Sequence, residues 1–261
     1  MKSAARCAIV IPSCEKYSDL WLGLSNSFKR YWADCSFDKY LISDGEGAAS
    51  FQDQFKIIPI TEDAGWSSNL KTGLKDIRDD YILLWIDDLF LTRDVDSAKI
   101  LRMYEFALSV NMDYLRFNPL PAPPNVSVIK DGFSLGRLPQ GDLYRTSTVC
   151  SLWRREVLVD LLDDRESAWE FEYIGSKRSD KYQNFFASVE RNFYVKNTVV
   201  KGKWDLHALS DVVRLGLVDG AGSRPVMSGR DFYVLKLKNM RSRLFSHVPR
   251  GMRRRLREWL L

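Results

Sequence analysis

The feature that most constrains the fold of this chain is a run of six almost wholly apolar residues, YILLWI, at positions 81–86. Three short apolar runs precede it, at 7–12, 39–43 and 55–60. Two segments have helical spacing of apolar residues, one at 18–32 after the first run and one at 66–77 after the third. Continuous apolar runs are typical of strands covered on both faces in a parallel sheet. Strands that alternate with helices predict a doubly wound α/β fold.

The second part of the chain has a less regular pattern. Its predicted elements are a helix at 97–110, a strand at 113–117, a hairpin at 126–138 with an Asp131-Gly132 turn, a strand at 148–153, a helix at 154–162 and a late strand at 195–200. We expect one domain over residues 1–225, with a first half at 1–96 and a second half at 97–225. A tail at 226–261 follows.

Composition excludes several classes of protein. With 261 residues and 45% apolar residues, the chain can bury a sizeable core. No apolar run reaches the roughly 18–20 residues of a membrane span, and the run at 7–11 is too short for a signal peptide, so we expect a cytoplasmic protein. The four cysteines have no zinc-like spacing, and only two histidines are present. Any metal must therefore bind mainly through carboxylates.

Two adjacent aspartates, Asp87 and Asp88, follow the apolar run directly. In open α/β sheets, ligands bind outside the carboxyl ends of the strands. Paired carboxylates there repel each other unless a cation or hydrogen-bond donors compensate their charge, and Mg²⁺ or Mn²⁺ would do so through oxygen ligands. A simpler interpretation is that one aspartate caps the next turn and the other is solvated.

The order of motifs over residues 7–96 resembles that of GT-A glycosyltransferases, especially the family 2 group. The proline motif that ends the first strand of that group corresponds to IVIPSCEKY at 9–17, and the acidic end of the second strand to LISDGEG at 41–47. The segment before the fourth strand corresponds loosely to AGWSSNLKTGLKDI at 64–77, and the DXD-type metal motif to Asp87-Asp88. The metal motif reads Asp-Asp-Leu, and Ser-Cys-Glu replaces Thr-Tyr-Asn, so the resemblance is to a divergent branch.

The resemblance implies a GT-A fold and a nucleotide-sugar donor bound at the ends of these strands. It places Pro12, Ser13 and Glu15 beside the donor, Asp44 on the base or ribose, and Asn69 or Lys71 near the donor. A divalent cation, Mn²⁺ or Mg²⁺, would bind Asp88 with support from Asp87 and offset the charge that develops on the β-phosphate.

A second set of chemical residues lies in DDRESAWEFEYIGSKRSDKY at 163–182. Inverting transferases of this fold use a carboxylate from the later half of the domain as general base toward the acceptor hydroxyl. Within Trp169-Glu170-Phe171-Glu172, we predict Glu172 as this base, with Glu170 as the second candidate, because neighbouring aromatic rings can contact sugars. Solvated glutamates at a helix start are the simpler interpretation. Arg178 could pair with a carboxylate or reach a phosphate, and a surface arginine is the simpler interpretation.

The segment VVKGKWDLH at 199–207 contains two lysines around a glycine. A basic loop of this kind would close over a diphosphate through Lys201 and Lys203. Enzymes of the resembled family often complete the metal site with a histidine from such a loop, and His207 is the candidate here. A surface or capping histidine is the alternative.

The basic character of the chain belongs to its end. Residues 230–261 carry a net charge of +8, and the others sum to −3. The segment at 241–261 has amphipathic spacing with arginines and a terminal Trp-Leu-Leu. We expect a basic amphipathic helical tail, either on an anionic membrane surface at the inner face of the cell membrane or packed on protein; nucleic-acid binding is the least favoured alternative.

The sequence therefore predicts a metal-dependent glycosyltransferase. The resemblance implies inversion, a glycan or lipid-linked glycan acceptor, and a role in surface polysaccharide biosynthesis. Two alternatives stay open. One is a nucleotidyltransferase, although Pro12-Ser13-Cys14-Glu15 stands where its phosphate loop is expected. The other is a non-catalytic nucleotide- or carbohydrate-binding relative.

Overall fold

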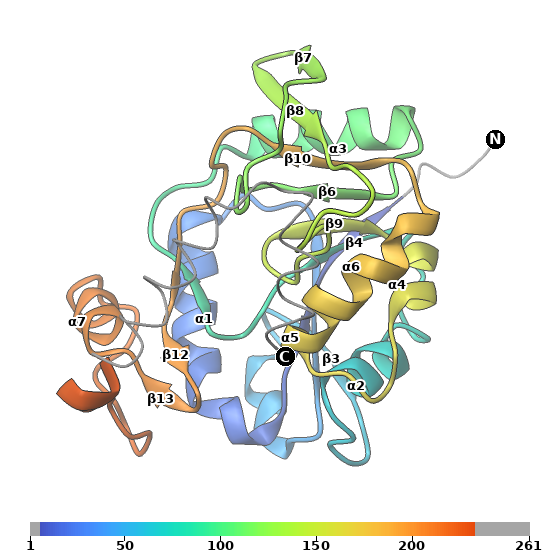
Figure 1. Ribbon diagram of the computed structural model, residues 1–261. Helices are drawn as coiled ribbons and strands as arrows, with labels where there is room; N and C mark the ends of the chain where they lie inside the picture. Colours follow the sequence, from blue (N-terminus) through green and yellow to red (C-terminus); the bar gives the residue numbers. More distant parts are fainter. Residues whose placement is uncertain (1–5, 233–261) are drawn as a thin grey trace.

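The computed structural model describes residues 6–232 of the chain. Its centre is a sheet of nine strands: β1 (Cys7–Pro12), β2 (Asp38–Ser43), β3 (Lys56–Pro59), β4 (Tyr81–Leu84), β6 (Tyr114–Arg116), β7 (Val128–Lys130), β8 (Phe133–Arg137), β9 (Ser151–Arg154) and β10 (Phe185–Ser188). Their order across the sheet is β3-β2-β1-β4-β9-β6-β10-β8-β7 (Figure 1).

Most strands of this sheet run in one direction. β1 is parallel to β2 and β4, β2 to β3, and β6 to β10. β9 runs antiparallel to its neighbours β4 and β6, and β8 runs antiparallel to β10 and β7. The expected mostly parallel α/β sheet is therefore confirmed.

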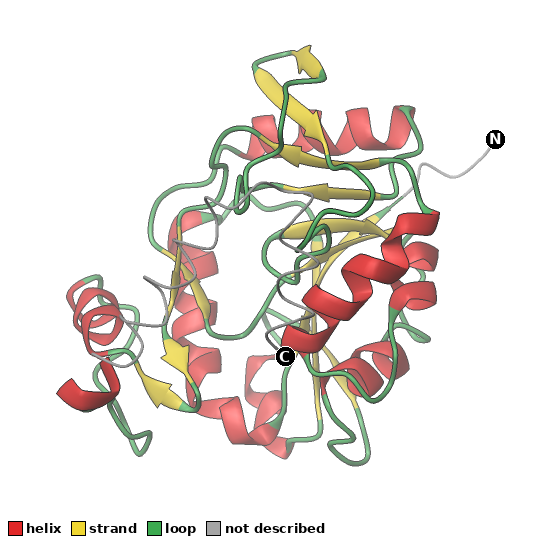
Figure 2. Cartoon of the chain, in the orientation of Figure 1, coloured by secondary structure: helices red, strands yellow, loops and turns green. Residues whose placement is uncertain are grey.

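Helices cover both faces of the sheet (Figure 2). The four that do so are α1 (Ser18–Tyr31), α2 (Trp66–Gly73), α3 (Ser97–Ser109) and α4 (Arg155–Leu161). Side chains of a strand alternate between the two faces, and β1 shows this directly. Cys7, Ile9 and Ile11 pack in one core cluster with α1 and α3, whereas Ala8 and Val10 pack in a second cluster with α2 and α4.

Several predicted elements are shorter or divided in the structure. The helix predicted at 66–77 ends at Gly73, and the strand predicted at 81–86 ends at Leu84. The strand predicted at 195–200 forms two short strands, because Thr198 between them hydrogen-bonds the backbone carbonyl of Asp88 through its N–H and its hydroxyl, at 2.9 Å each.

These short strands form two small additional ladders. β11 (Val195–Asn197) pairs antiparallel with β5 (Leu89–Leu91), which directly follows the two aspartates. β12 (Val199–Val200) forms a hairpin with β13 (Lys203–Trp204), and α7 (Leu206–Arg214) follows it. The late part of the chain is thereby fixed beside the carboxyl end of β4.

An irregular helix connects α4 to β10. It consists of α5 (Ala168–Glu170), the π-helical turn η3 (Phe171–Gly175), α6 (Ser176–Arg178) and the 3₁₀ turn η4 (Ser179–Lys181). Two further 3₁₀ turns, η1 (Glu15–Tyr17) and η2 (Glu46–Phe51), follow β1 and β2. Single π-turns inside helices are frequent at functional sites.

Two predictions concern membranes. Within residues 6–232, no helix combines the length and the apolar character that a membrane crossing needs. The predicted amphipathic tail at 226–261 lies outside the described residues from position 233 onward, so its membrane contact stays a prediction.

Candidate active site

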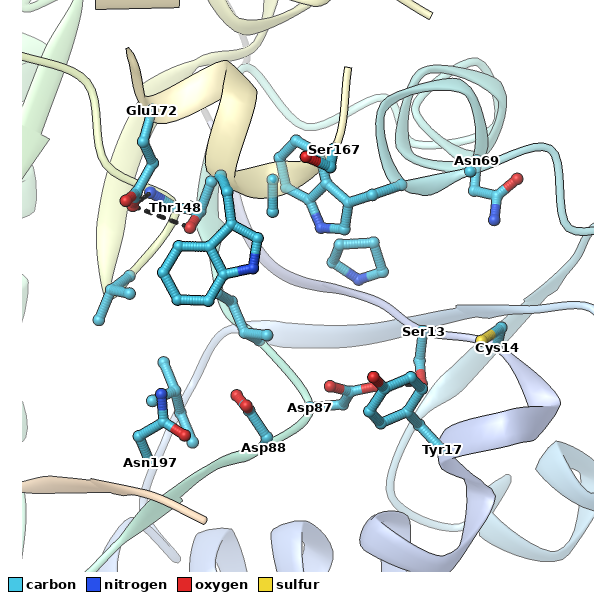
Figure 3. A pocket seen from close by; sticks show the side chains of 18 of the residues that line it. Ser13, Cys14, Tyr17, Asn69, Asp87, Asp88, Thr148, Ser167, Glu172 and Asn197 are labelled. Carbon is cyan, nitrogen blue, oxygen red and sulfur yellow. Dashed lines mark hydrogen bonds between the residues drawn. The ribbon is translucent and has the colours of Figure 1, made fainter. Parts of the chain in front are cut away.

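A cavity of about 350 Å³ opens at the carboxyl ends of β1 and β4. Its walls come from the loop after β1, the start of α2, the loop after β4 and the irregular helix (Figure 3). This is the edge at which open α/β sheets bind ligands. The cavity is therefore the candidate active site.

The two aspartates form one wall of the cavity. Asp87 is 6% exposed, and its carboxylate accepts a hydrogen bond from Ser13 Oγ. Ser13 Oγ in turn accepts one from the indole N–H of the buried Trp21, at 2.9 Å. Burial raises the pKa of both aspartates, and the charge of Asp87 raises the pKa of Asp88 further. Asp87 is buried and Asp88 half-buried, so negative charge on the pair is costly and a bound cation would offset that cost.

The pair fits a hard divalent cation only if a ligand completes the coordination. Among residues 6–232, no group of three or more His, Cys, Asp or Glu side chains is arranged to hold a metal ion. Mg²⁺ in enzymes is commonly held by one or two carboxylates together with substrate phosphates and water. Asp87 and Asp88 match that partial set, so a diphosphate in the cavity would supply the missing oxygens.

Glu172 lies on the wall opposite the aspartates (Figure 3). It belongs to the π-helical turn η3, and its Oε1 accepts three hydrogen bonds, from Ser147 Oγ at 3.0 Å, Thr148 N at 2.7 Å and Thr148 Oγ1 at 3.0 Å. Among the described residues, no hydrogen-bond donor reaches its other oxygen, Oε2. The contacts fix the side-chain orientation and leave one carboxylate oxygen to accept a proton from a ligand.

Glu170, the second candidate base, has a different role in the structure. Its carboxylate accepts hydrogen bonds from Ser167 N at 2.8 Å and Ser167 Oγ at 2.7 Å, which completes a capping box at the start of α5. These hydrogen bonds lower the pKa of Glu170, which is exposed and does not line the cavity. The structure brings Glu172, and not Glu170, to the aspartates' cavity.

Among the predicted donor residues, Pro12, Ser13 and Asn69 line the cavity. Asn69 is held by its Oδ1, which accepts from Ala64 N at 3.0 Å, and by its Nδ2, which donates to an aspartate of the same loop. Glu15 and Asp44 are not on the cavity wall, but they contact each other: Glu15 N donates to Asp44 Oδ1 at 2.8 Å. Asp44 thereby holds the loop that follows β1.

Lys71 and Arg178 lie together at a different surface depression. Lys71 forms an ion pair with Asp164 at 3.1 Å. Arg178 donates to both carboxylate oxygens of the buried Glu166 at 2.6 Å and to the carbonyl of Leu161. The structure does not bring either side chain to the cavity.

The three predicted residues of the late loop are also absent from the cavity wall. Lys201 occupies the turn between β12 and β13 with a φ of 52°, and Lys203 pairs with Asp231 at 2.9 Å. His207 is exposed on α7, with its ring centroid 4.9 Å from that of Phe232. In this arrangement His207 does not contribute to the aspartate pair.

The structure adds residues to the site that no sequence motif predicted. Thr148, in the bend before β9, and Asn197, the last residue of β11, line the cavity. Trp66 contributes an indole N–H that has no hydrogen-bond acceptor among the described residues. Arg224 stacks over the ring of Tyr17 at 4.7 Å and pairs with Asp19, and its charge lowers the pKa of both Asp87 and Asp88.

Trp169 belongs to the aromatic motif at 169–172, whose rings are expected to contact sugars. Its side chain is 77% exposed although it lines the cavity. A large exposed indole at the wall of this cavity is suited to contact a sugar ring.

Comparisons with known proteins were made on sequence and on structure. No protein-family model and no curated protein matches the sequence. Among solved structures, S. aureus TarS 1-349 in complex with UDP-GlcNAc matches with a TM-score of 0.52 and 11% identity over 76% of this chain and 60% of that chain. The mannosyltransferase PcManGT from Pyrobaculum calidifontis in complex with GDP-Man and Mn²⁺ matches with a TM-score of 0.50 and 10% identity, over 77% and 59% of the two chains.

These matches concern the fold. The present chain spans about three fifths of the length of each of the two solved chains. Its sheet order, its two helical layers and the place of its cavity at the carboxyl ends of β1 and β4 agree with the architecture predicted from the motifs of residues 7–96. The chain has the GT-A fold, the fold of these nucleotide-sugar glycosyltransferases.

Proposed function

We propose that this chain is a glycosyltransferase that uses a nucleotide-sugar donor and a divalent cation. The proposal rests on two groups of carboxylates that face each other across one cavity. Asp87 and Asp88 concentrate buried negative charge on one wall, and Glu172 is held in a fixed orientation on the other. The GT-A fold supports the same function.

The aspartate wall is suited to the leaving group. Asp87, Asp88 and a donor diphosphate would together hold Mg²⁺ or Mn²⁺. The cation, when bound, supplies positive charge that stabilises the departing nucleoside diphosphate. Ser13 keeps Asp87 in place, and Arg224 offsets part of the negative charge around the pair.

Glu172 is suited to activate the acceptor. It would take the proton from an acceptor hydroxyl while that oxygen forms a bond to the anomeric carbon of the donor sugar and the bond from that carbon to the diphosphate oxygen breaks. A single displacement of this kind inverts the anomeric configuration. We propose a glycan or lipid-linked glycan as the acceptor and surface polysaccharide biosynthesis as the setting, as the resemblance implies.

The first test is a thermal-shift screen of UDP, GDP, dTDP and CMP with and without Mn²⁺. A ligand that binds the folded state raises the melting temperature. We expect a metal-dependent rise with one nucleotide that is lost in Asp88→Asn and kept in Asp94→Asn, a matched change at an exposed aspartate. The nucleotide then defines the donor for a transfer assay with analysis of the product anomer.

Two results would contradict the proposal. The absence of any nucleotide-dependent rise in a well-folded protein would favour a non-catalytic relative with another ligand. Release of pyrophosphate from a nucleoside triphosphate, without transfer from a nucleotide-sugar, would identify a nucleotidyltransferase instead.

A further inference from the structure

A second cavity of about 230 Å³ adjoins the candidate active site. The two cavities share Val149 and Glu172 as wall residues. The aspartates line the first cavity and not the second, so a substrate in the second cavity would meet Glu172 without contacting them. This is the place for the acceptor if Glu172 acts as its base.

The second cavity has a buried arginine with unused donors in its wall. Arg116, the last residue of β6, is 1% exposed. Its Nη1 donates to the carbonyls of Leu120 at 2.8 Å and Tyr144 at 3.2 Å, whereas its Nε and Nη2 have no hydrogen-bond partner among residues 6–232. Nε and Nη2 form one edge of the guanidinium, the fork that binds carboxylate or phosphate with two parallel hydrogen bonds.

The charge of Arg116 also lacks a counterion. In the described part of the chain, no carboxylate forms an ion pair with it. A guanidinium does not lose its proton in proteins, so burial without an anion is costly. Glu172 lies in the same cavity wall, but its hydrogen bonds go to Ser147 and Thr148. The structure thus provides a buried positive charge whose partner is missing.

Another buried arginine, which also forms no ion pair among the described residues, satisfies its guanidinium in a different way. Arg145 is also 1% exposed, yet its Nε, Nη1 and Nη2 all donate, to the carbonyls of Leu138, Ser179 and Tyr182, and its guanidinium stacks on Phe185 at 4.2 Å. Arg145 is a fully bonded structural residue. Arg116, in contrast, lines the cavity that contains Glu172 with two buried donors that no acceptor among the described residues reaches.

A second cation stands in the same wall. Arg191 is exposed, contacts the ring of Tyr194 at 5.8 Å, and forms no ion pair among the described residues. Asn118 fixes the backbone next to it, because its Oδ1 accepts from the N–H groups of Asn192 and Phe193 at 3.0 Å. The cavity therefore presents two positive charges and one carboxylate.

We propose that the second cavity binds an acceptor that carries an oxyanion, either a phosphate or a carboxylate. Arg116 would hold the oxyanion through its Nε–Nη2 fork, Arg191 would add charge from the rim, and an acceptor hydroxyl would face Glu172. This inference rests on the proposed transferase function. It adds the chemical class of the acceptor: a phosphate-bearing glycan or an acidic sugar, rather than a neutral one.

The test measures equilibrium binding to the full-length protein at physiological salt with two matched probe pairs. Glycerol phosphate is compared with glycerol, and galacturonic acid with galactose, by calorimetry or ligand-observed NMR. We expect one anionic probe to bind at least tenfold more tightly than its neutral partner, and the pair that responds distinguishes phosphate from carboxylate. Arg116→Lys, which keeps the charge but loses the fork, should weaken this binding about 10–100-fold.

Two surface variants test whether weaker probe binding in Arg116→Lys results merely from a loss of folding. Arg191 and Arg93 are both exposed and both stack on the ring of Tyr194, at 5.8 and 4.5 Å, but only Arg191 lines the cavity. Arg191→Ala should weaken binding of the anionic probe by up to about fivefold, because a positive charge on the cavity rim is lost. Arg93→Ala should leave this binding unchanged.

The outcomes separate this inference from the function on which it rests. Equal binding of anionic and neutral probes, or equal affinity in wild type, Arg116→Lys and Arg191→Ala, overturns the oxyanion site even if a nucleotide binds with metal. Displacement of the anionic probe by the nucleotide alone also overturns it, because the probe would then occupy the donor cavity. Arginine-dependent probe binding in a protein that binds no nucleotide supports the anion site and contradicts the transferase proposal.

Discussion

The replacement Glu172→Gln tests the proposed chemistry most directly. Glutamine has nearly the same shape as glutamate, and its carbonyl oxygen can accept the hydrogen bonds that Ser147 and Thr148 now donate to Oε1. It cannot take a proton from an acceptor hydroxyl. The replacement therefore removes the base and keeps the local structure.

The two effects differ in size. Loss of a general base lowers kcat by about 10²–10⁴-fold, which corresponds to about 2.7–5.4 kcal/mol in the activation barrier. The stability cost is smaller. Three hydrogen bonds to one charged oxygen become hydrogen bonds to a neutral oxygen, and the smaller desolvation of an uncharged group offsets part of the loss, so we expect about 1–2 kcal/mol. The protein should stay folded and lose turnover.

The assay compares Glu172→Gln with Glu170→Ala. Glu170 lies two residues away in the same irregular helix, where it completes the capping box with Ser167. Its removal should cost about 0.5–2 kcal/mol of stability and leave kcat unchanged. Turnover, nucleotide affinity and melting temperature are measured for both variants with the donor that the nucleotide screen identifies.

Three results would refute this reasoning. Full turnover in Glu172→Gln would show that Glu172 is not the base. Loss of nucleotide binding in the same variant would assign Glu172 to the donor. A large loss of kcat in a folded Glu170→Ala protein would move the base to the exposed carboxylate, against its position outside the cavity.

Three further predictions concern the charges around the cavity. In the presence of a chelator, Asp88→Asn should raise the melting temperature by about 2–4 °C per kcal/mol of relieved repulsion. The pKa values of Asp87 and Asp88 are raised in the folded state, so the metal-free protein loses stability as the pH rises above about 4. The difference in melting temperature between the variant and the wild type should therefore grow from about pH 5 to about pH 8. Arg178→Ala should cost about 2–4 kcal/mol in denaturant unfolding, because it leaves the buried carboxylate of Glu166 without its partner, and nucleotide affinity should not change; a loss of affinity larger than tenfold would return Arg178 to the donor site. Ser13→Ala removes a hydrogen bond to Asp87 and should weaken Mn²⁺-dependent nucleotide binding in calorimetry by about tenfold; unchanged binding would show that Ser13 does not support the metal site.

The sequence by itself determined the elements that depend on local periodicity. The apolar run that ends before Asp87 predicted a buried strand, and its place among alternating helices predicted that the aspartates would lie at the ligand-binding edge of the sheet. The Asp131-Gly132 turn predicted the hairpin of β7 and β8, since both residues adopt the positive φ that such a turn requires. In each case, residues close together in the sequence are sufficient to predict the element.

The tertiary structure decided which charged side chains meet. Glu170 and Glu172 are two residues apart and equally acidic, but the π-turn directs Glu172 to the cavity while Glu170 caps its own helix. Arg178 reads as a phosphate ligand in sequence, yet the buried Glu166 neutralises it.

The same dependence on tertiary contacts explains Arg116, which stood in a predicted strand without any functional signal. Only its burial, with two donors unused and no ion pair among the described residues, marks it as an anion ligand. Periodicity reports whether a residue is buried. Whether its charge is compensated depends on partners brought close by the order of the strands, and that order is a property of the whole fold.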